Sequence, residues 1–428
     1  MKKESLAAWR AVAPQAIAGL VARLALVAWT TPLELSQTES RFWDLATSRL
    51  AATAFLPPLY PFFLALVRAL VGDDLTSVRV VGACLSIPSI AMVHRLAERH
   101  LGPGEGRLPA WCAALMPSLV YYDGRLRSES LGVLLLLLFA LLWTAPASGG
   151  SRGVRLTVAA GGVLGLLALL RPEFLLLPVL LAVVGLVRRA GRGGLRRAAL
   201  LLPGMLLLVG PWTLRNERVL GTWALVSSNA GYNFWKSFNP WSDGSQVPIE
   251  NYTAWDGVPE ARYDALGFEL GWAYIREHPV RSLILAPAKL AHLFGPERDF
   301  LSDTRRGRFP SRSRLVDLGF GVTQNLTWIL LLGGGLFALL GPSRTPVKDV
   351  ALSVLLNLAL VHLVFFGDDR FHVPLVPFLC IVLPEAWEGS LRSPRAVRAL
   401  ALASGALGVV WIYDLARDLD RLATLFGP

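Results

Sequence analysis

Apolar runs about as long as a membrane-spanning helix recur along the whole chain, and they constrain its fold more than any other feature. About thirteen runs of roughly 16 to 25 residues can be marked, and an α-helix needs about 20 residues to cross the hydrocarbon core of a bilayer. Of the 428 residues, 54% are hydrophobic and only 17% are charged, with a mean hydropathy of +0.49. The sequence predicts an all-α polytopic membrane protein with about 11–13 transmembrane helices, in which the shorter runs either span the membrane or lie on its surface.

Basic residues orient these helices. Lys and Arg (42) outnumber Asp and Glu (31), and the excess lies in short clusters between apolar runs, as the positive-inside rule predicts for cytoplasmic loops. The basic N-terminus precedes an apolar run that we interpret as a retained first helix leading outward, because no convincing signal-peptide cleavage site follows it. If residues 57–71 do not span, the basic clusters near 94–107, 152–155 and 188–197 all lie inside. Nucleic-acid binding is a poor explanation of the charge, since no basic stripe alternates with exposed aromatic residues.

We expect one membrane domain, 1–428, in three parts. Residues 1–213 form a seven-helix module whose external loop, 31–75, contains an interfacial amphipathic helix over 37–50. Residues 214–280 form a second external loop, and the stretch 211–280 holds six Trp, which suits a membrane interface or a sugar platform.

The C-terminal helices, 281–428, have a less certain orientation. The arginines between 298 and 314 belong inside by charge alone. The sequence GDDRFH at 367–372 is cytoplasmic if residues 281–295 span the membrane and external if they do not. We favour the external placement.

Carboxylates near the outer surface are the first candidates for catalysis. Glu39, with Asp44 in the same loop, could act as general base for an acceptor hydroxyl; the alternative is the solvated face of an interfacial helix. The two positions lie about 140° apart around a helix, so both cannot enter one pocket. Asp123 and Glu129 flank the outer end of the third span, where ionisable groups are costly unless paired or functional. Surface ion pairs and acids at a helix N-terminus are the alternatives there.

Arginines beside apolar runs are candidates for binding phosphate. Arg171, Arg215 and Arg370 could each hold a lipid phosphate, because guanidinium groups bind phosphate oxygens bidentately. Snorkelling at helix ends explains each of them equally well. Asp369 precedes Arg370, and this pair could bind phosphate or brace loops.

The sequence requires no cofactor. A divalent metal held by Asp123 or Glu129 is compatible with it, whereas no pair of His residues has the spacing of a zinc site. The three cysteines, Cys84, Cys112 and Cys380, each lie inside an apolar run and offer no CxxC motif.

Several short motifs together resemble a known family. They are, in order, TESRFWDLA, PPLYPFFLALVRALVG, Ser128-Glu129, Leu170-Arg171-Pro172, PWTLRN, SSNAGYNFW and DRFHVPLVP. Their order and spacing, over about residues 10–390, resemble the glycosyltransferase 39 and protein-mannosyltransferase-like group, which includes the lipid A aminoarabinose transferases. This resemblance implies the GT-C fold, juxtamembrane helices in the first external loop, and an active site on the outer face.

The resemblance also assigns residues. The family's first-loop acidic motif is commonly Asp-Glu and reads Thr38-Glu39 here, so Glu39 is the matching acid and Asp44 the alternative base. Leu56 stands where the family often has His or Lys, and Tyr60 of the following Pro-Pro-Leu-Tyr stretch is expected near the acceptor or sugar together with Asp123, Glu129 and Asp369. Arg171, Arg215 and Arg370 are expected to bind the donor phosphate.

Members of this group transfer a sugar from a polyprenyl-phosphate donor to a hydroxyl of a lipid, glycan or protein. We therefore expect a hexosyl or pentosyl transferase of the bacterial inner membrane, with an extracytoplasmic site, in contact with membrane lipids. Two alternatives stay open. A transporter or flippase of lipid-linked glycans is disfavoured because no paired repeat is visible, and a non-catalytic relative is kept open by Thr38.

Overall fold

The computed structural model describes residues 2–47, 52–145, 150–188, 191–246, 255, 257–388, 405, 408 and 411. Within these residues the secondary structure is helical and contains no strand, and a single parallel bridge joins Ser245 to Gly367. The predicted all-α class is confirmed. The last predicted apolar run, 397–413, lies almost wholly outside the described residues.

Six described helices are long and apolar enough to cross a membrane. They are Trp9–Trp29, Leu75–Leu101, Ser151–Leu170, Gly193–Leu220, Arg314–Leu340 and Pro346–Val364. Three shorter apolar helices accompany them, over Leu59–Val71, Glu129–Trp143 and Pro172–Val187. The chain is therefore an integral membrane protein, and the number of 11–13 spans stays a prediction.

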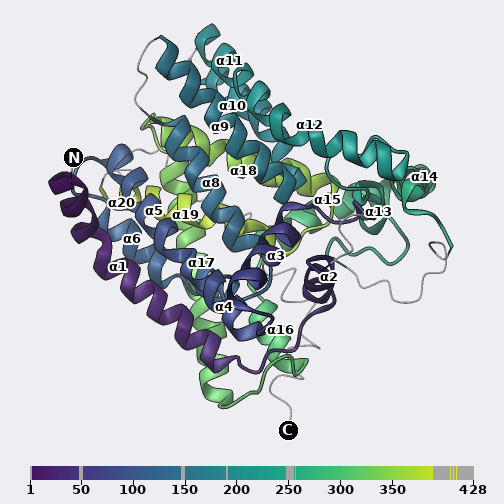
Figure 1. Ribbon diagram of the computed structural model, residues 1–428, viewed down its shortest axis with the longest axis horizontal. Coiled ribbons are helices and arrows are strands. Elements are labelled where there is room, and N and C mark those ends of the chain that lie inside the picture. Colours follow the sequence, from purple (N-terminus) through teal and green to yellow (C-terminus); the bar gives the residue numbers. More distant parts are fainter. Residues whose placement is uncertain are drawn as a thin grey trace.

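The first half of the chain forms most of the apolar bundle. Its elements are α1 (Lys2–Trp29), α4 (Leu75–Cys84), α5 (Ser86–Leu101), α6 (Arg107–Leu115), α7 (Pro117–Asp123), α8 (Glu129–Trp143), α9 (Ser151–Leu170), η2 (Pro172–Leu176), α10 (Leu177–Val187), α11 (Gly191–Ala199) and α12 (Leu201–Leu220). Figure 1 shows α1 and α12 along opposite edges of the molecule. One large hydrophobic cluster joins α5, α8 and α9 to the later helices, with Phe139 and Leu164 at its centre.

The second half returns through that bundle. Its elements are α13 (Ala230–Ser237), η4 (Glu260–Arg262), α14 (Tyr263–Glu277), α15 (Pro279–Phe294), α16 (Asp299–Arg305), α17 (Arg314–Leu340), α18 (Pro346–Val364), η5 (Asp369–Leu375), α19 (Val376–Val382) and α20 (Pro384–Glu388). Trp328 of α17, Val354 of α18 and Phe378 of α19 are fully buried in the main core.

Proline breaks several of the apolar runs that the sequence suggested were continuous. The run 108–120 divides at Met116, whose extended backbone precedes Pro117 at the start of α7. The run 371–387 becomes η5, α19 and α20, with Pro374 inside the 3-10 segment and Pro377 at the start of α19. Counting apolar runs therefore does not count continuous helices.

Two short helices lie in the first predicted external loop, as expected. They are α2 (Gln37–Leu45) and α3 (Leu59–Val71). A capping box begins α2, because the Ser36 hydroxyl accepts from the Glu39 amide while the Glu39 carboxylate accepts from the Ser36 amide. Positive φ at Gly72 (84°) ends α3.

The region after residue 213 differs from the prediction. The seventh span does not end there, because α12 continues through Pro211 to Leu220, where Gly221 adopts the left-handed conformation that ends it. Residues 214–280 are not an open loop either, since they hold the end of α12, α13, η4 and α14. The end of α12 was predicted as a loop because it contains a proline and a polar turn. In the structure the Asn216 side chain donates to the Ala224 carbonyl and stabilises this helix end.

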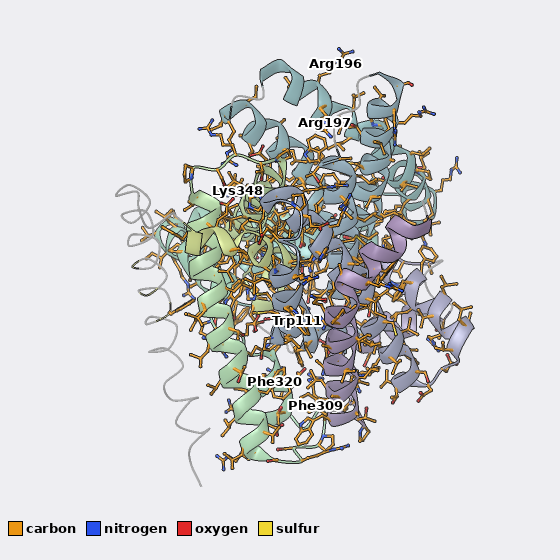
Figure 2. The ribbon with its side chains drawn as sticks, turned by 90° about the vertical axis from the view of Figure 1, so that its left-hand side faces the viewer. Trp111, Arg196, Arg197, Phe309, Phe320 and Lys348 are labelled. Atoms are coloured by element: carbon orange, nitrogen blue, oxygen red, sulfur yellow. The ribbon has the colours of Figure 1, made fainter. Side chains whose placement is uncertain are left out.

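The predicted external loops gather at one end of the molecule. Arg312 donates to the Thr31 carbonyl, the Glu34 amide to the Arg308 carbonyl, Arg215 to the Thr53 carbonyl, and the Gly367 amide to the Gly244 carbonyl. Figure 2 shows Phe309 at one end, far from Arg196 and Arg197 at the other. The arginines after residue 305 therefore share a side with loop 31–75, against the expectation from charge alone, and so does GDDRFH.

Candidate active site

Glu39 is the most completely buried acid at this end of the molecule. It has no exposed surface, and Arg125 approaches its carboxylate with Nε at 2.9 Å and Nη2 at 2.8 Å. The amides of Ser36 (2.9 Å) and Leu126 (3.3 Å) also donate to it. Burial alone would raise the pKa of Glu39, but Arg125, Arg127 and Ser36 hold that pKa below its usual value. The solvated-face alternative is therefore wrong for Glu39, and its contacts favour holding Arg125 over accepting a proton.

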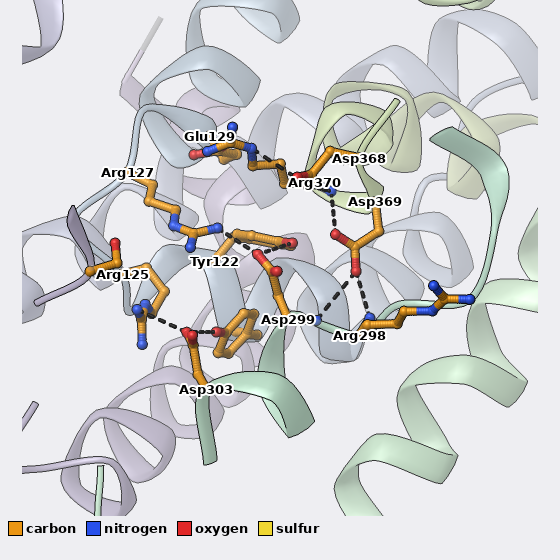
Figure 3. Close-up of polar contacts among 12 residues, drawn as sticks. Tyr122, Arg125, Arg127, Glu129, Arg298, Asp299, Asp303, Asp368, Asp369 and Arg370 are labelled. Carbon is orange, nitrogen blue, oxygen red and sulfur yellow. Dashed lines mark hydrogen bonds and ion pairs between the residues drawn. The ribbon is translucent and has the colours of Figure 1, made fainter. Parts of the chain in front are cut away.

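The turn after α7 carries two arginines into an acidic layer formed by α16 (Figure 3). Arg125 Nη2 also lies 2.9 Å from Asp303, which accepts the Tyr121 hydroxyl at 2.7 Å. Arg127 pairs with Asp299, which accepts the Tyr122 hydroxyl. The two acids lie four residues apart and so share one face of α16. The sequence analysis missed them, although this spacing was a usable signal.

Asp299 also begins a cluster with Asp368 and Asp369. Oxygens of these three carboxylates lie within 4.8 Å of one another. Burial and the two neighbouring carboxylates raise the pKa of Asp369 well above its usual value. Asp369 accepts the amides of Arg298 (2.5 Å) and Arg370 (2.9 Å), so existing contacts account for its position. The metal predicted at Asp123 or Glu129 stays a prediction.

Arg171, Glu129 and Arg370 form a second group beside this acidic layer. Arg171 Nη1 lies 3.9 Å from Glu129 Oε1, and the guanidiniums of Arg171 and Arg370 lie 5.6 Å and 4.8 Å from the centre of the Phe371 ring. Glu129 and Arg171 are buried, yet Glu129 Oε2 and Arg171 Nη1 have no hydrogen-bond partner among the described residues. A hydrogen-bond acceptor on Glu129 and a donor on Arg171 are therefore buried close together without partners. This costs free energy unless a ligand bonds to them.

The remaining predicted site residues are placed differently. Tyr60 is buried edge-on to Phe42 of α2, with ring centroids 4.9 Å apart, and the charges of Glu129 and Glu39 both act on it. Asp44 is exposed on α2, as the five-residue offset from Glu39 predicted. Asp123 is bound to the buried Arg23 of α1 at 2.6 Å. Arg215 stacks on Trp212 at 4.7 Å and donates to the Thr53 carbonyl.

Aromatic side chains border the site on the side of α13. Tyr232 lies within 6 Å of Phe55 and Trp255, and Trp255 contacts Trp235 and Tyr263. By contrast, Trp223, Trp241 and Trp272 are exposed. Whether these Trp residues serve a membrane interface or a sugar platform stays a prediction.

His372 fixes the segment that carries Arg370. Its ring is fully buried and stacked on Trp328, with centroids 3.7 Å apart. Nδ1 lies 2.7 Å from the Leu293 carbonyl and Nε2 lies 2.9 Å from Glu297. This histidine braces η5 against the end of α15.

The chain is similar in sequence and in fold to known membrane glycosyltransferases. Residues 56–212 match the sequence model of the dolichyl-phosphate-mannose-protein mannosyltransferase family. The crystal structure of ArnT from Cupriavidus metallidurans bound to undecaprenyl phosphate superposes with a TM-score of 0.53 and 16% identity, over 92% of this chain and 62% of that one. The chain has the GT-C fold. The predicted resemblance to protein-mannosyltransferase-like and aminoarabinose-transferase-like proteins is confirmed.

A second GT-C structure is also similar. The oligosaccharyltransferase AglB from Archaeoglobus fulgidus, in complex with an inhibitory peptide and a dolichol-phosphate, has a TM-score of 0.50 and 12% identity, over 96% of this chain and 54% of that one. This GT-C chain thus spans somewhat over half the length of the structures it resembles. A sequence comparison with curated proteins finds no match.

Proposed function

We propose that this GT-C protein transfers a sugar from a polyprenyl-phosphate donor to a hydroxyl of a lipid, glycan or protein, at the extracytoplasmic face of a bacterial inner membrane. The observation that carries the proposal is the buried pair of Glu129 and Arg171, in which one carboxylate oxygen and one guanidinium nitrogen have no partner among the described residues. The structural relatives were solved with polyprenyl phosphates bound.

Each unused group suits one half of the reaction. The acceptor oxygen attacks the anomeric carbon, the bond from that carbon to the phosphate oxygen breaks, and the electron pair stays on the phosphate. Glu129 takes the proton of the acceptor hydroxyl, because its Oε2 has no hydrogen-bond partner among the described residues. Arg171 and Arg370, which both lie near the Phe371 ring, hold the phosphate. Glu39 keeps Arg125 in place, and Arg215 is used at the end of α12.

The test uses purified protein in liposomes that contain a panel of polyprenyl-phosphate hexoses and pentoses, with envelope lipids as acceptors. We expect release of free polyprenyl phosphate, and we expect Glu129→Gln to lower kcat by at least about 100-fold, as for loss of a general base. Asp73→Asn, at an exposed acid in a surface ion pair with Arg68, is the matched control and should keep wild-type turnover.

Three outcomes would contradict the proposal. Unchanged turnover in Glu129→Gln would remove Glu129 as the base. Loss of turnover in Glu39→Gln, with Glu129→Gln active, would return that role to Glu39. Movement of the donor across the bilayer without release of polyprenyl phosphate would favour the flippase alternative.

A further inference from the structure

Lys236 is a buried cation to which no acid among the described residues is bonded. Its side chain, on α13, is 8% exposed. In the part of the chain that the structure describes, no carboxylate or carbonyl oxygen is bonded to its ammonium, which instead lies 5.8 Å from the centre of the Tyr232 ring and 5.3 Å from that of Phe366. A buried ammonium is stable when it is paired or strongly hydrogen bonded, and two distant aromatic faces are weak substitutes.

The neighbours of Lys236 make its position more costly. Burial, followed by the charges of Arg370 and Arg41, lowers the pKa of Lys236 to about 8, and Asp368 opposes them. Arg370 contacts Asp368 at 3.5 Å and Gln246 at 2.7 Å. Arg41 is exposed, 5.8 Å from the Phe55 ring. Three cations from α2, α13 and η5 therefore act on the same space, and Asp368 is the nearest acid that offsets them.

We propose that Lys236 binds the phosphate of the departing polyprenyl phosphate, beside Arg370, and stabilises the charge that this phosphate gains as the glycosidic bond breaks. This inference rests on the proposed transferase function. In the donor the phosphate is a diester with one negative charge. When the carbon–oxygen bond breaks, the electron pair remains on the phosphate oxygen and the charge becomes about −2. No proton moves to or from Lys236.

The chemistry explains why a lysine suits this place. A group that interacts more strongly with the transition state than with the bound donor raises kcat. Arg370 already contacts Asp368, whereas no carboxylate among the described residues is bonded to the ammonium of Lys236.

The test compares Lys236→Met with Arg276→Met, which removes an exposed cation from the adjacent α14. Three quantities are measured: kcat and KM for the donor, the inhibition constant of undecaprenyl phosphate, and thermal stability with and without undecaprenyl phosphate. For Lys236→Met we expect kcat to fall and product inhibition to weaken by roughly 10- to 100-fold each, as for loss of one hydrogen bond between charged groups. The donor KM should change several-fold less, and Arg276→Met should behave as wild type.

Stability separates this role from a structural one. Without ligand, Lys236→Met should unfold at the same or a higher temperature than wild type, because an unpaired buried charge has been removed. Undecaprenyl phosphate should stabilise wild type and Lys236→Arg more than Lys236→Met. A ligand-free Lys236→Met protein that is less stable than wild type, or one with wild-type kcat and product inhibition, would overturn the proposal. Equal weakening of donor and product binding would also overturn it. If wild type neither binds undecaprenyl phosphate nor turns over, the proposed function itself fails.

Discussion

Removing Arg125 should destabilise the protein more than neutralising Glu39, because the two changes leave different buried groups without a partner. In Arg125→Met, Glu39 keeps two amide donors but loses both guanidinium bonds in a site with no exposed surface. Asp303 loses the same arginine but retains Arg308 at 2.9 Å and the Tyr121 hydroxyl. An uncompensated buried charge costs roughly 3–5 kcal/mol.

Neutralising Glu39 leaves a smaller defect. In Glu39→Gln the amide oxygen can still accept from the Ser36 amide, and Arg125 remains paired with Asp303. We therefore expect a loss of about 1–3 kcal/mol. The double variant should be more stable than Arg125→Met alone, because no unpaired carboxylate remains at position 39, with a coupling energy of about 0.5–3 kcal/mol.

Denaturant titration in detergent micelles, followed by tryptophan fluorescence near pH 7, measures all four proteins. At this pH Glu39 is ionised, since its pKa is held below the usual value. If Arg125→Met were as stable as wild type, or the two losses simply added, the structural role of the pair would be refuted. If Glu39→Gln kept full stability and lost all turnover, Glu39 would be catalytic after all.

Two further predictions follow from other charged groups. Burial, Arg370 and Arg41 lower the pKa of Lys236 to about 8, so its cation is present below that pH and lost above it. We therefore expect kcat/KM for the donor to fall as pH rises through about 8. In a pH–rate profile, Lys236→Arg should move this fall to higher pH. Asp123→Asn should lower the unfolding temperature while leaving the donor KM unchanged, since Asp123 faces Arg23 and not the site; a raised KM without loss of stability would return Asp123 to the acceptor side.

The sequence predicted the helical class, an interfacial helix over 37–50 (observed as α2, Gln37–Leu45) and the resemblance to GT-C enzymes, because each depends on local pattern. Apolar length identifies membrane helices and a capping sequence begins α2. The sequence did not predict where a proline interrupts an apolar run. Pro211 lies within α12, whereas Pro117 begins a new helix. That outcome depends on whether neighbouring groups satisfy the freed carbonyls.

The site was harder to predict than the fold because it depends on long-range partners. The residues around Glu39 in the sequence do not predict that Arg125 will bind its carboxylate. Those around Glu129 do not predict that its Oε2 will lack a hydrogen-bond partner among the described residues. Asp299 and Asp303 lie in an arginine-rich stretch whose net charge concealed them. The sequence shows that residue 236 is a lysine, but it does not show that the folded chain buries this side chain.

The arginine-rich segment 305–314 provides the clearest test of which end of the molecule faces outward. By charge it belongs in the cytoplasm, yet Arg308 pairs with Asp303 and Arg312 donates to the carbonyl of Thr31, just beyond the end of α1. If α1 crosses the membrane once with its basic N-terminus in the cytoplasm, as the charge rule predicts, we expect that end to face out. The arginines bonded there carry less free charge than their number suggests.

Single cysteines make the prediction measurable. In a variant with Cys84, Cys112 and Cys380 replaced by Ser, an impermeant maleimide applied to intact cells should label Arg306→Cys and Thr47→Cys alike. Arg196→Cys, at the opposite end (Figure 2), should react only after permeabilisation. If Arg306→Cys reacted together with Arg196→Cys, segment 305–314 could not lie beside loop 31–75. The contacts that bring α16 to Arg125 and Arg127 would then be wrong, and the proposed site would lose its acidic layer.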